Sequence, residues 1–294
     1  MENATALAWS LWTELGVSGW QRSHSSHAID PERLILFTAS LGDADPRLRD
    51  EATDWCIAYG RYVSAARLRN LLAAETPEAQ AAFGRMAATV NAHSNARWPG
   101  ATQARPFART RRSAVADFSG PSLVVLRLRA HAEQGARAEV VRAFLADPSA
   151  RLSAADAAAA ASYTKRNVAE ALEALRMAGL LEVHAQRNQR LYGLTDAEWL
   201  TALPGSLPDS FPRWSSVFRI LEGLIGGACR AEALTARART VEASDVLRDL
   251  RSDFRLAGVR LSEEEEGPDA WVTMQRLAVE LAGAWASGSF TSTA

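Results

Sequence analysis

The segment from Arg151 to Leu194 constrains the fold of this chain more than any other part of the sequence. A Ser153-Ala-Ala-Asp156 pattern is typical of a helix N-cap and opens a short alanine-rich helix, which ends in a tight turn at 161–163. Thr164 caps a second helix, which ends at Gly179. Its apolar positions recur every three or four residues, at Val168, Ala171, Leu172 and Leu175. The sequence therefore predicts two helices joined by a tight turn.

A hairpin is predicted directly after these helices. Leu181 to Ala185 alternates between apolar and polar residues as a strand does, and Arg190 to Leu194 reads as a returning strand. The residues between them, Arg187-Asn188-Gln189, form a polar turn. The complete order is helix, turn, helix and two-stranded hairpin.

This order resembles the winged helix-turn-helix domain of MarR-like and ArsR-like bacterial transcriptional regulators. The resemblance covers about residues 120–200, and the hairpin would be the wing. It is carried by Ser162-Tyr163-Thr164-Lys165-Arg166-Asn167-Val168, Leu172, Leu175, Ala178-Gly179-Leu180-Leu181, the Arg187 to Arg190 tip and Tyr192. We therefore expect a mainly α-helical fold, in which a winged helix is flanked by helical domains.

The resemblance implies that the helix Thr164–Ala178 reads the major groove of DNA with its N-terminal residues. Arg or Lys can donate two hydrogen bonds to guanine, Asn can pair with adenine, and a helix N-terminus can bind a phosphate. The expected DNA-binding residues on this helix and the turn before it are Ser162, Tyr163, Thr164, Lys165, Arg166 and Asn167. The wing residues Arg187, Asn188, Gln189 and Arg190 would contact the DNA backbone or the minor groove. The alternatives are a solvated helix start with a polar hairpin, or a winged helix that binds protein.

The distribution of charge favours a nucleic-acid partner, although the formal net charge of the chain is only −1. Residues 101–194 contain 14 basic and 8 acidic residues, whereas the segments before and after them are both acidic. Positive charge concentrated on one segment is the electrostatic pattern of a DNA-binding module. Of the 33 basic residues only Lys165 is a lysine, so the excess of arginine carries no information by itself.

Proline-rich breaks divide the chain into four predicted parts. Residues 1–100 form a helical domain, 101–120 a basic linker, 121–203 the winged helix, and 204–294 a helical domain for dimerisation or effector binding. Asp30-Pro31 and Asp45-Pro46 are helix starts in the first part. Residues 48–72 also have a helix-turn-helix character, which leaves a second, degenerate winged helix open there.

The linker contains a cluster of arginines: Arg105, Arg109, Arg111 and Arg112. Such a cluster could form a basic arm that enters a minor groove beside the winged helix. The alternative is a solvated linker in an arginine-rich protein.

These features predict a cytoplasmic, sequence-specific regulator that binds double-stranded DNA, acts as a repressor and is a homodimer on a pseudo-palindromic operator. A small-molecule or protein effector is compatible with the terminal domains. The alternative is an antitoxin or adaptor that uses the winged helix to bind a partner protein. No enzyme motif, cofactor motif, signal peptide or membrane span is present, and His24, His27 and Asp30 lack the further ligands of a metal site. An enzyme acting on nucleic acid would require acidic residues that only the fold could bring together.

Overall fold

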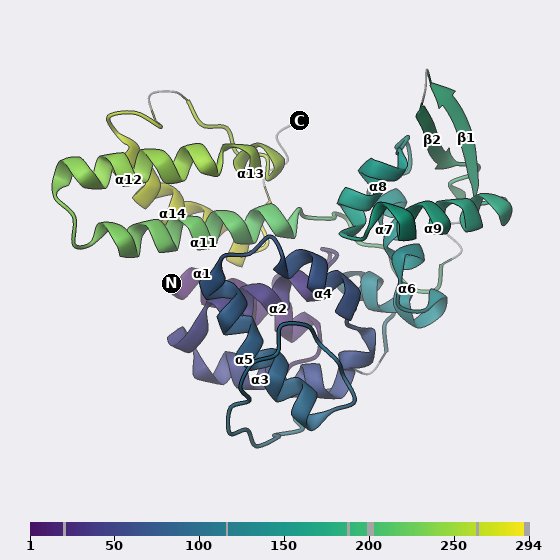
Figure 1. Ribbon diagram of the computed structural model, residues 1–294, viewed down its shortest axis with the longest axis horizontal. Coiled ribbons are helices and arrows are strands. Elements are labelled where there is room, and N and C mark those ends of the chain that lie inside the picture. The colour runs from purple at the N-terminus through teal and green to yellow at the C-terminus, as the bar shows by residue number, and fades with distance from the viewer. Residues whose placement is uncertain (20–21, 116, 187–188, 199–202, 263–264, 291–294) are drawn as a thin grey trace.

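The computed structural model describes residues 1–294 except 20–21, 116, 187–188, 199–202, 263–264 and 291–294 (Figure 1). The protein is mainly helical and has one antiparallel sheet of two strands in the described part, which confirms the coarse fold class predicted from the sequence. The N-terminal helices are α1 (Glu2–Glu14), α2 (Pro31–Ser40), α3 (Pro46–Tyr59), α4 (Ala65–Leu72) and α5 (Pro77–His93). The central elements are α6 (Val124–Ala132), α7 (Ala136–Ala146), α8 (Ala154–Ala161), α9 (Lys165–Met177), β1 (Leu181–Gln186) and β2 (Gln189–Leu194). The C-terminal helices are α11 (Trp214–Ala231), α12 (Ala236–Asp249), α13 (Arg251–Leu256) and α14 (Ala270–Ala286).

Local sequence signals set the starts of the N-terminal helices. The side chain of Asp30 accepts a hydrogen bond from the backbone N–H of Arg33, and Asp45 accepts one from Leu48, with proline at the first helical position of α2 and α3. Each cap satisfies a backbone donor that the helix leaves unpaired. Both predicted helix starts are confirmed.

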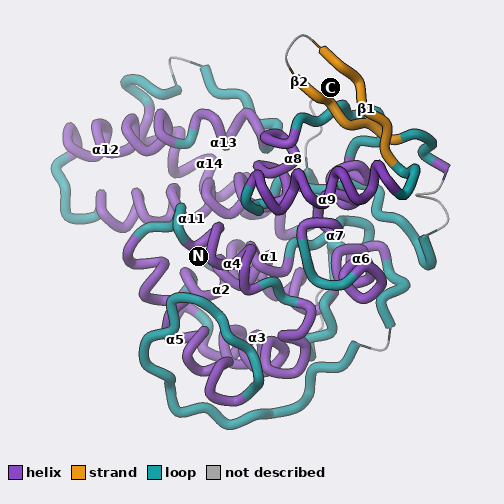
Figure 2. Tube along the Cα trace, turned by 45° about the vertical axis from the view of Figure 1, so that its right-hand side comes forward, coloured by secondary structure: helices purple, strands orange, loops and turns teal. Residues whose placement is uncertain are grey.

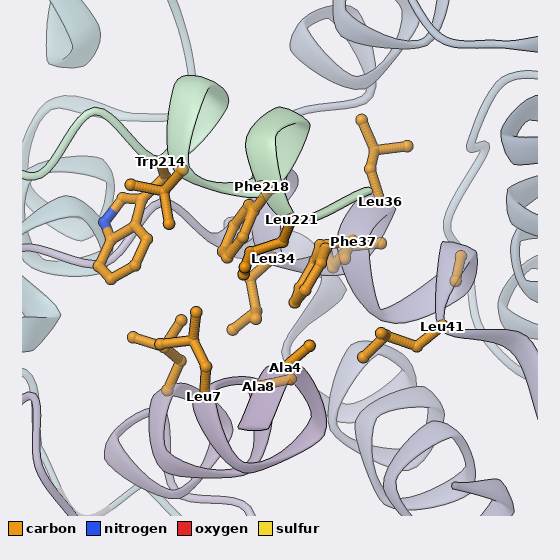
Figure 3. Close-up of a cluster of buried hydrophobic side chains, with 14 of the residues drawn as sticks. Ala4, Leu7, Ala8, Leu34, Leu36, Phe37, Leu41, Trp214, Phe218 and Leu221 are labelled. Carbon is orange, nitrogen blue, oxygen red and sulfur yellow. The ribbon is translucent and has the colours of Figure 1, made fainter. Parts of the chain in front are cut away.

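The N-terminal and C-terminal helices share one hydrophobic core, which we call the helical body. The rings of Phe37 in α2 and Phe218 in α11 stack with their centroids 4.3 Å apart, and side chains of α1 lie on the other side of this pair (Figure 3). The division of the sequence into separate domains at 1–100 and 204–294 therefore differs from the structure. Residues 34–37 of α2 are all buried, so this helix needs apolar partners on more than one side.

A second core lies in the central segment, which we call the central module (residues 124–211). The four apolar positions predicted for the second helix, Val168, Ala171, Leu172 and Leu175 of α9, are all buried in it. Helix α6 belongs to both cores, because Leu126 packs in the helical body whereas Val124, Val125 and Leu128 pack in the central module.

The described residues of the predicted linker (101–115 and 117–120) have no regular secondary structure, but they lie against the helical body as a strap. The backbone N–H of Thr102 bonds to the carbonyl of Gly84, and the N–H of Ala114 bonds to that of Gly16. A Cβ atom at Gly84 would lie 2.6 Å from the carbonyl oxygen of Gly100, so only glycine allows the strap to approach α5 this closely.

Residues 48–72 do not form a second winged helix. They form α3, a short 3-10 helix (Gly60–Tyr62) and α4, and the next regular element is α5 rather than a hairpin. All residues from 46 to 93 are described, and none of them is in a strand. Their apolar side chains instead pack in the helical body.

His24 and His27 connect the N-terminal segment to the C-terminal end of the chain. The ring of His24 contacts Ser10 Oγ and the carbonyl of Trp285, both at 2.8 Å. Because a carbonyl only accepts, Nε2 of His24 carries the proton and Nδ1 accepts from Ser10. His27 contacts Ser210 Oγ at 2.7 Å and the carbonyl of Gly288 at 3.0 Å. Both rings are thus used in structural hydrogen bonds.

Burial lowers the pKa of His24 to about 4, although the carbonyl of Trp285 opposes this shift. The unfolded chain therefore binds a proton that the folded protein rejects, and folding stability should fall as the pH drops from 6.5 towards 4. We expect a loss of about 2–3 kcal/mol from this group over that range. Urea unfolding of the wild type and of His24→Gln between pH 7 and 4.5 measures it, with the exposed His93→Gln as control. Equal pH slopes in the wild type and His24→Gln would contradict the assignment.

Candidate nucleic-acid interface

The two helices on either side of the turn, α8 and α9, each begin with a side-chain cap. Ser153 and Asp156 form a reciprocal capping box at the start of α8. Thr164 Oγ1 accepts from the backbone N–H of Asn167 at 3.3 Å and so starts α9. Between the helices, Ser162 has φ 55° and ψ 41°, the left-handed conformation that ends α8.

The first turn of α9 presents its polar side chains to solvent. Lys165, Arg166 and Asn167 are exposed, whereas Val168 directly after them is buried in the central module. Arg166 Nε lies 3.1 Å from Glu170 Oε1, and both side chains are largely exposed. An exposed pair four residues apart on a helix stabilises it by only about 0.3–0.5 kcal/mol, so Arg166 can leave Glu170 for another acceptor at little cost.

The hairpin is joined to the segment before α8, where the single extended residue Leu152 pairs with β2. β1 and β2 pair antiparallel, with Leu181 opposite Leu194 and Gln186 opposite Gln189. Leu152 exchanges two backbone hydrogen bonds with Tyr192, at 2.9 and 2.8 Å. The sequence did not reveal this pairing, because a single extended residue before a helix shows no alternation. The pairing fixes the hairpin next to α8 and α9 (Figures 1 and 2).

The predicted wing residues divide into two groups. Gln189 and Arg190 are exposed at the beginning of β2. Arg187 and Asn188, which were predicted to lie at the wing tip, fall outside the described residues. The described part of the hairpin therefore supplies one exposed cation, Arg190, beside α9.

Tyr163 faces the helical body instead of solvent, contrary to its prediction as a DNA contact, and Ser162 before it is half-buried. Tyr163 is buried, and its hydroxyl lies 2.5 Å from Ser64 Oγ. The carbonyl of Ser162 accepts a hydrogen bond from Asn70 Nδ2 at 3.1 Å. Both residues contact the helical body, because the left-handed turn directs them to the side of the module that faces α4.

Two of the predicted linker arginines are held on the helical body by ion pairs. Arg105 and Arg109 form ion pairs with Asp43 and Asp54, and the backbone N–H of Arg111 bonds to Asp54 as well. The Asp54 side chain is only 1% exposed, so it anchors the strap to the body. Both ribbon views show the strap at the opposite end of the protein from β1 and β2 (Figures 1 and 2). Arg112 is exposed on this same strap. Arg105 and Arg109 are therefore not part of a free basic arm, whereas DNA contacts by the side chains of Arg111 and Arg112 stay a prediction.

A buried group of charges joins the helical body to the central module, and we call it the junction cluster. Arg129 of α6 contacts Glu32 of α2 at 2.7 Å and Glu139 of α7 at 2.6 Å. Arg67 of α4 contacts Glu32 at 2.7 Å and Asp30 at 2.5 Å. No residue in this network could be identified from the sequence, because the partners are up to 97 positions apart.

Electrostatics within the junction cluster keep Glu139 and Asp30 ionised. Burial alone would raise the pKa of Glu139, but the guanidinium groups of Arg129, Arg67 and Arg142 outweigh it and lower that pKa to about 2. Burial likewise opposes ionisation of Asp30, and Arg67 nevertheless holds its pKa well below the usual range. Every charge in the cluster is thus compensated at neutral pH, as buried charges need to be.

Comparison with protein-family models, with curated proteins and with solved structures found no match to this chain. Among the described residues, no group of three or more His, Cys, Asp or Glu side chains is arranged to hold a metal ion. No helix in the described part is both long and apolar enough to cross a bilayer.

Proposed function

We propose that the central module is a winged helix-turn-helix and that the protein is a sequence-specific regulator that binds double-stranded DNA as a repressor. One observation carries this proposal: the capped N-terminal turn of α9 presents Lys165, Arg166 and Asn167 to solvent while the opposite face of α9 is buried. The order of α7, the extended Leu152, α8, α9 and the β1–β2 hairpin supports the proposal, because it is the order of elements in a winged helix.

The exposed turn has the chemistry that base recognition needs. Arg166 or Lys165 can donate to guanine O6 and N7, and the side-chain amide of Asn167 can pair with adenine. Arg190, at the start of β2, would contact a phosphate beside the groove. Without the strap, residues 121–194 still contain 10 basic and 7 acidic residues, and this excess adds the sequence-independent attraction that DNA-binding proteins use.

Repression and dimerisation are part of the same proposal. A homodimer would place two copies of α9 on half-sites about 34–36 Å apart, one turn of B-DNA. The helical body is the part of the chain available to join two copies or to bind an effector, since the central module supplies the DNA contacts.

A second candidate function is an antitoxin or adaptor that binds a partner protein through the same module. It is favoured by one observation, the acidic Glu170 and Glu173 that follow Arg166 on α9. Carboxylates would repel the phosphates of DNA but would complement a basic protein surface.

Selection of duplexes from a random-sequence library, followed by binding measurements, tests the DNA proposal. We expect the wild type to prefer the selected duplex over a scrambled one. Lys165→Ala and Arg166→Ala should each weaken binding to the selected duplex by about 1–3 kcal/mol if they contact bases. Arg237→Ala, an exposed arginine of α12, is the matched control and should leave affinity unchanged. If no duplex binds at 50 mM salt, where electrostatic affinity is high, the DNA proposal is wrong and the partner-protein function becomes the better one.

A further inference from the structure

The turn that leads into α9 has an unfavourable backbone conformation. Ser162 has φ 55°, in the left-handed region that residues other than glycine rarely adopt. Such conformations persist where the surrounding structure holds them, and they concentrate at functional sites. Lys165 begins α9 only three residues later, so the conformation of Ser162 sets the direction in which α9 leaves the turn.

Helix α4 of the helical body contacts three consecutive residues of this turn. Arg67 Nε donates to the carbonyl of Ala161 at 3.1 Å, and Asn70 Nδ2 donates to the carbonyl of Ser162 at 3.1 Å. Ser64, the N-cap of α4, lies 2.5 Å from the hydroxyl of Tyr163. All three contacts join residues more than 90 positions apart in the sequence.

Helix α4 is itself firmly held in the helical body. Leu68 and Leu71 are buried in the body core, and the guanidinium of Arg67 is paired with Asp30 and Glu32. On its other side, Ala66 packs against the core of the central module. In Figure 1, α4 lies at the side of the body that faces α6–α9. A displacement of α4 would therefore disturb the turn through three hydrogen bonds and the core of the central module through one apolar contact.

We propose that α4 positions the reading end of α9, with Ser64, Arg67 and Asn70 as positioning residues that hold the left-handed turn at 161–163. The effect of these residues on DNA recognition rests on the proposed DNA-binding function, whereas their contacts with the turn do not depend on it. Under this arrangement the central module distinguishes its target DNA sequence from others only while its turn at 161–163 is bonded to α4. An effector that moves α4 would change sequence recognition without touching the DNA-facing side chains.

The test uses substitutions that remove hydrogen bonds and leave the buried charges paired. Asn70→Ala and Tyr163→Phe, alone and combined, delete two contacts to the turn. Asn91→Ala is the matched control, because Asn91 Nδ2 of α5 also donates to a carbonyl at 3.1 Å, that of Trp98, far along the body from the module. Hydrogen exchange of the backbone amides of residues 162–168 is measured without DNA. Affinity is then measured for a duplex selected by the wild type and for its scrambled version.

For the combined variant we expect exchange at 162–168 to be about tenfold faster and affinity for the selected duplex to be about tenfold lower, as the loss of two hydrogen bonds suggests. Affinity for the scrambled duplex should stay within about twofold, since the phosphate contacts remain. Adding Ser162→Gly should recover part of the selected-duplex affinity, because glycine adopts this φ without steric cost. Asn91→Ala should change none of these quantities.

Two results would overturn the inference while leaving the proposed function standing: exchange at 162–168 that does not change, or faster exchange with unchanged affinity for the selected duplex. A wild type that binds no duplex would refute the proposed function and with it the reading role. In that case the exchange data would still decide whether α4 holds the turn.

Discussion

Replacing Arg129 with methionine is expected to lower the free energy of unfolding by about 3–5 kcal/mol, which is what breaking a buried ion pair from one side costs. Its guanidinium is 1% exposed and contacts Glu32, Glu139 and the carbonyl of Tyr62 at distances between 2.6 and 3.1 Å. Methionine keeps an unbranched apolar stem but has no charge, so two carboxylates would remain buried with fewer partners. Arg67 would still contact Glu32 but could not replace the hydrogen bonds that Arg129 makes to Glu139.

Urea unfolding followed by circular dichroism at pH 7.5 measures this loss. Arg137→Met is the matched control, because Arg137 is an exposed arginine on the neighbouring helix α7 and should change stability by less than about 0.5 kcal/mol. Arg129→Lys should also be destabilised, since a single ammonium lacks the planar fork that joins Glu32 to Glu139. A loss below 1 kcal/mol in Arg129→Met would mean that the junction cluster is hydrated in solution.

The parts of the fold that follow from local physics could be predicted. The caps at Asp30, Asp45, Ser153 and Thr164 act over three residues, so the sequence displays them directly. The same holds for the amphipathic face of α9, whose buried positions have the period of the helix. Helix starts and the exposed side of α9 were therefore accessible from the sequence alone.

What the sequence could not predict depends on contacts between distant segments. Tyr163 resembles a DNA contact by its place in the turn, but its hydroxyl partner Ser64 lies 99 positions earlier. The linker arginines resemble a free basic arm, but Asp54 pairs with Arg109 from 55 positions away. The shared core of the N-terminal and C-terminal helices could not be predicted for the same reason, since nothing in residues 31–40 indicates that α11 packs on them.

Replacing Leu172 with aspartate is expected to unfold the central module and leave the helical body folded. Leu172 is fully buried at the centre of the module core, so the variant loses apolar burial and places a carboxylate without a partner in its stead. The combined cost of several kcal/mol is comparable to the whole stability of a module of this size, about 0.05–0.15 kcal/mol per residue. The body keeps its own core, and Arg67 keeps Asp30 and Glu32, which all belong to the body.

Tryptophan fluorescence and hydrogen exchange separate the two parts. Every tryptophan among the described residues packs in the helical body, and Trp199 falls outside them. In a Trp199→Phe background the emission maximum should therefore stay close to that of the folded protein while the helical circular dichroism falls. Amides of α7, α8 and α9 should exchange rapidly, and those of α1, α2 and α11 should remain protected. Met177→Asp, at an exposed position of the same helix, should behave as the wild type. A red-shifted emission and loss of protection in α1 and α11 would instead mean that the junction cluster makes the two cores one cooperative unit, in which case α4 could not act as a separable support for α9.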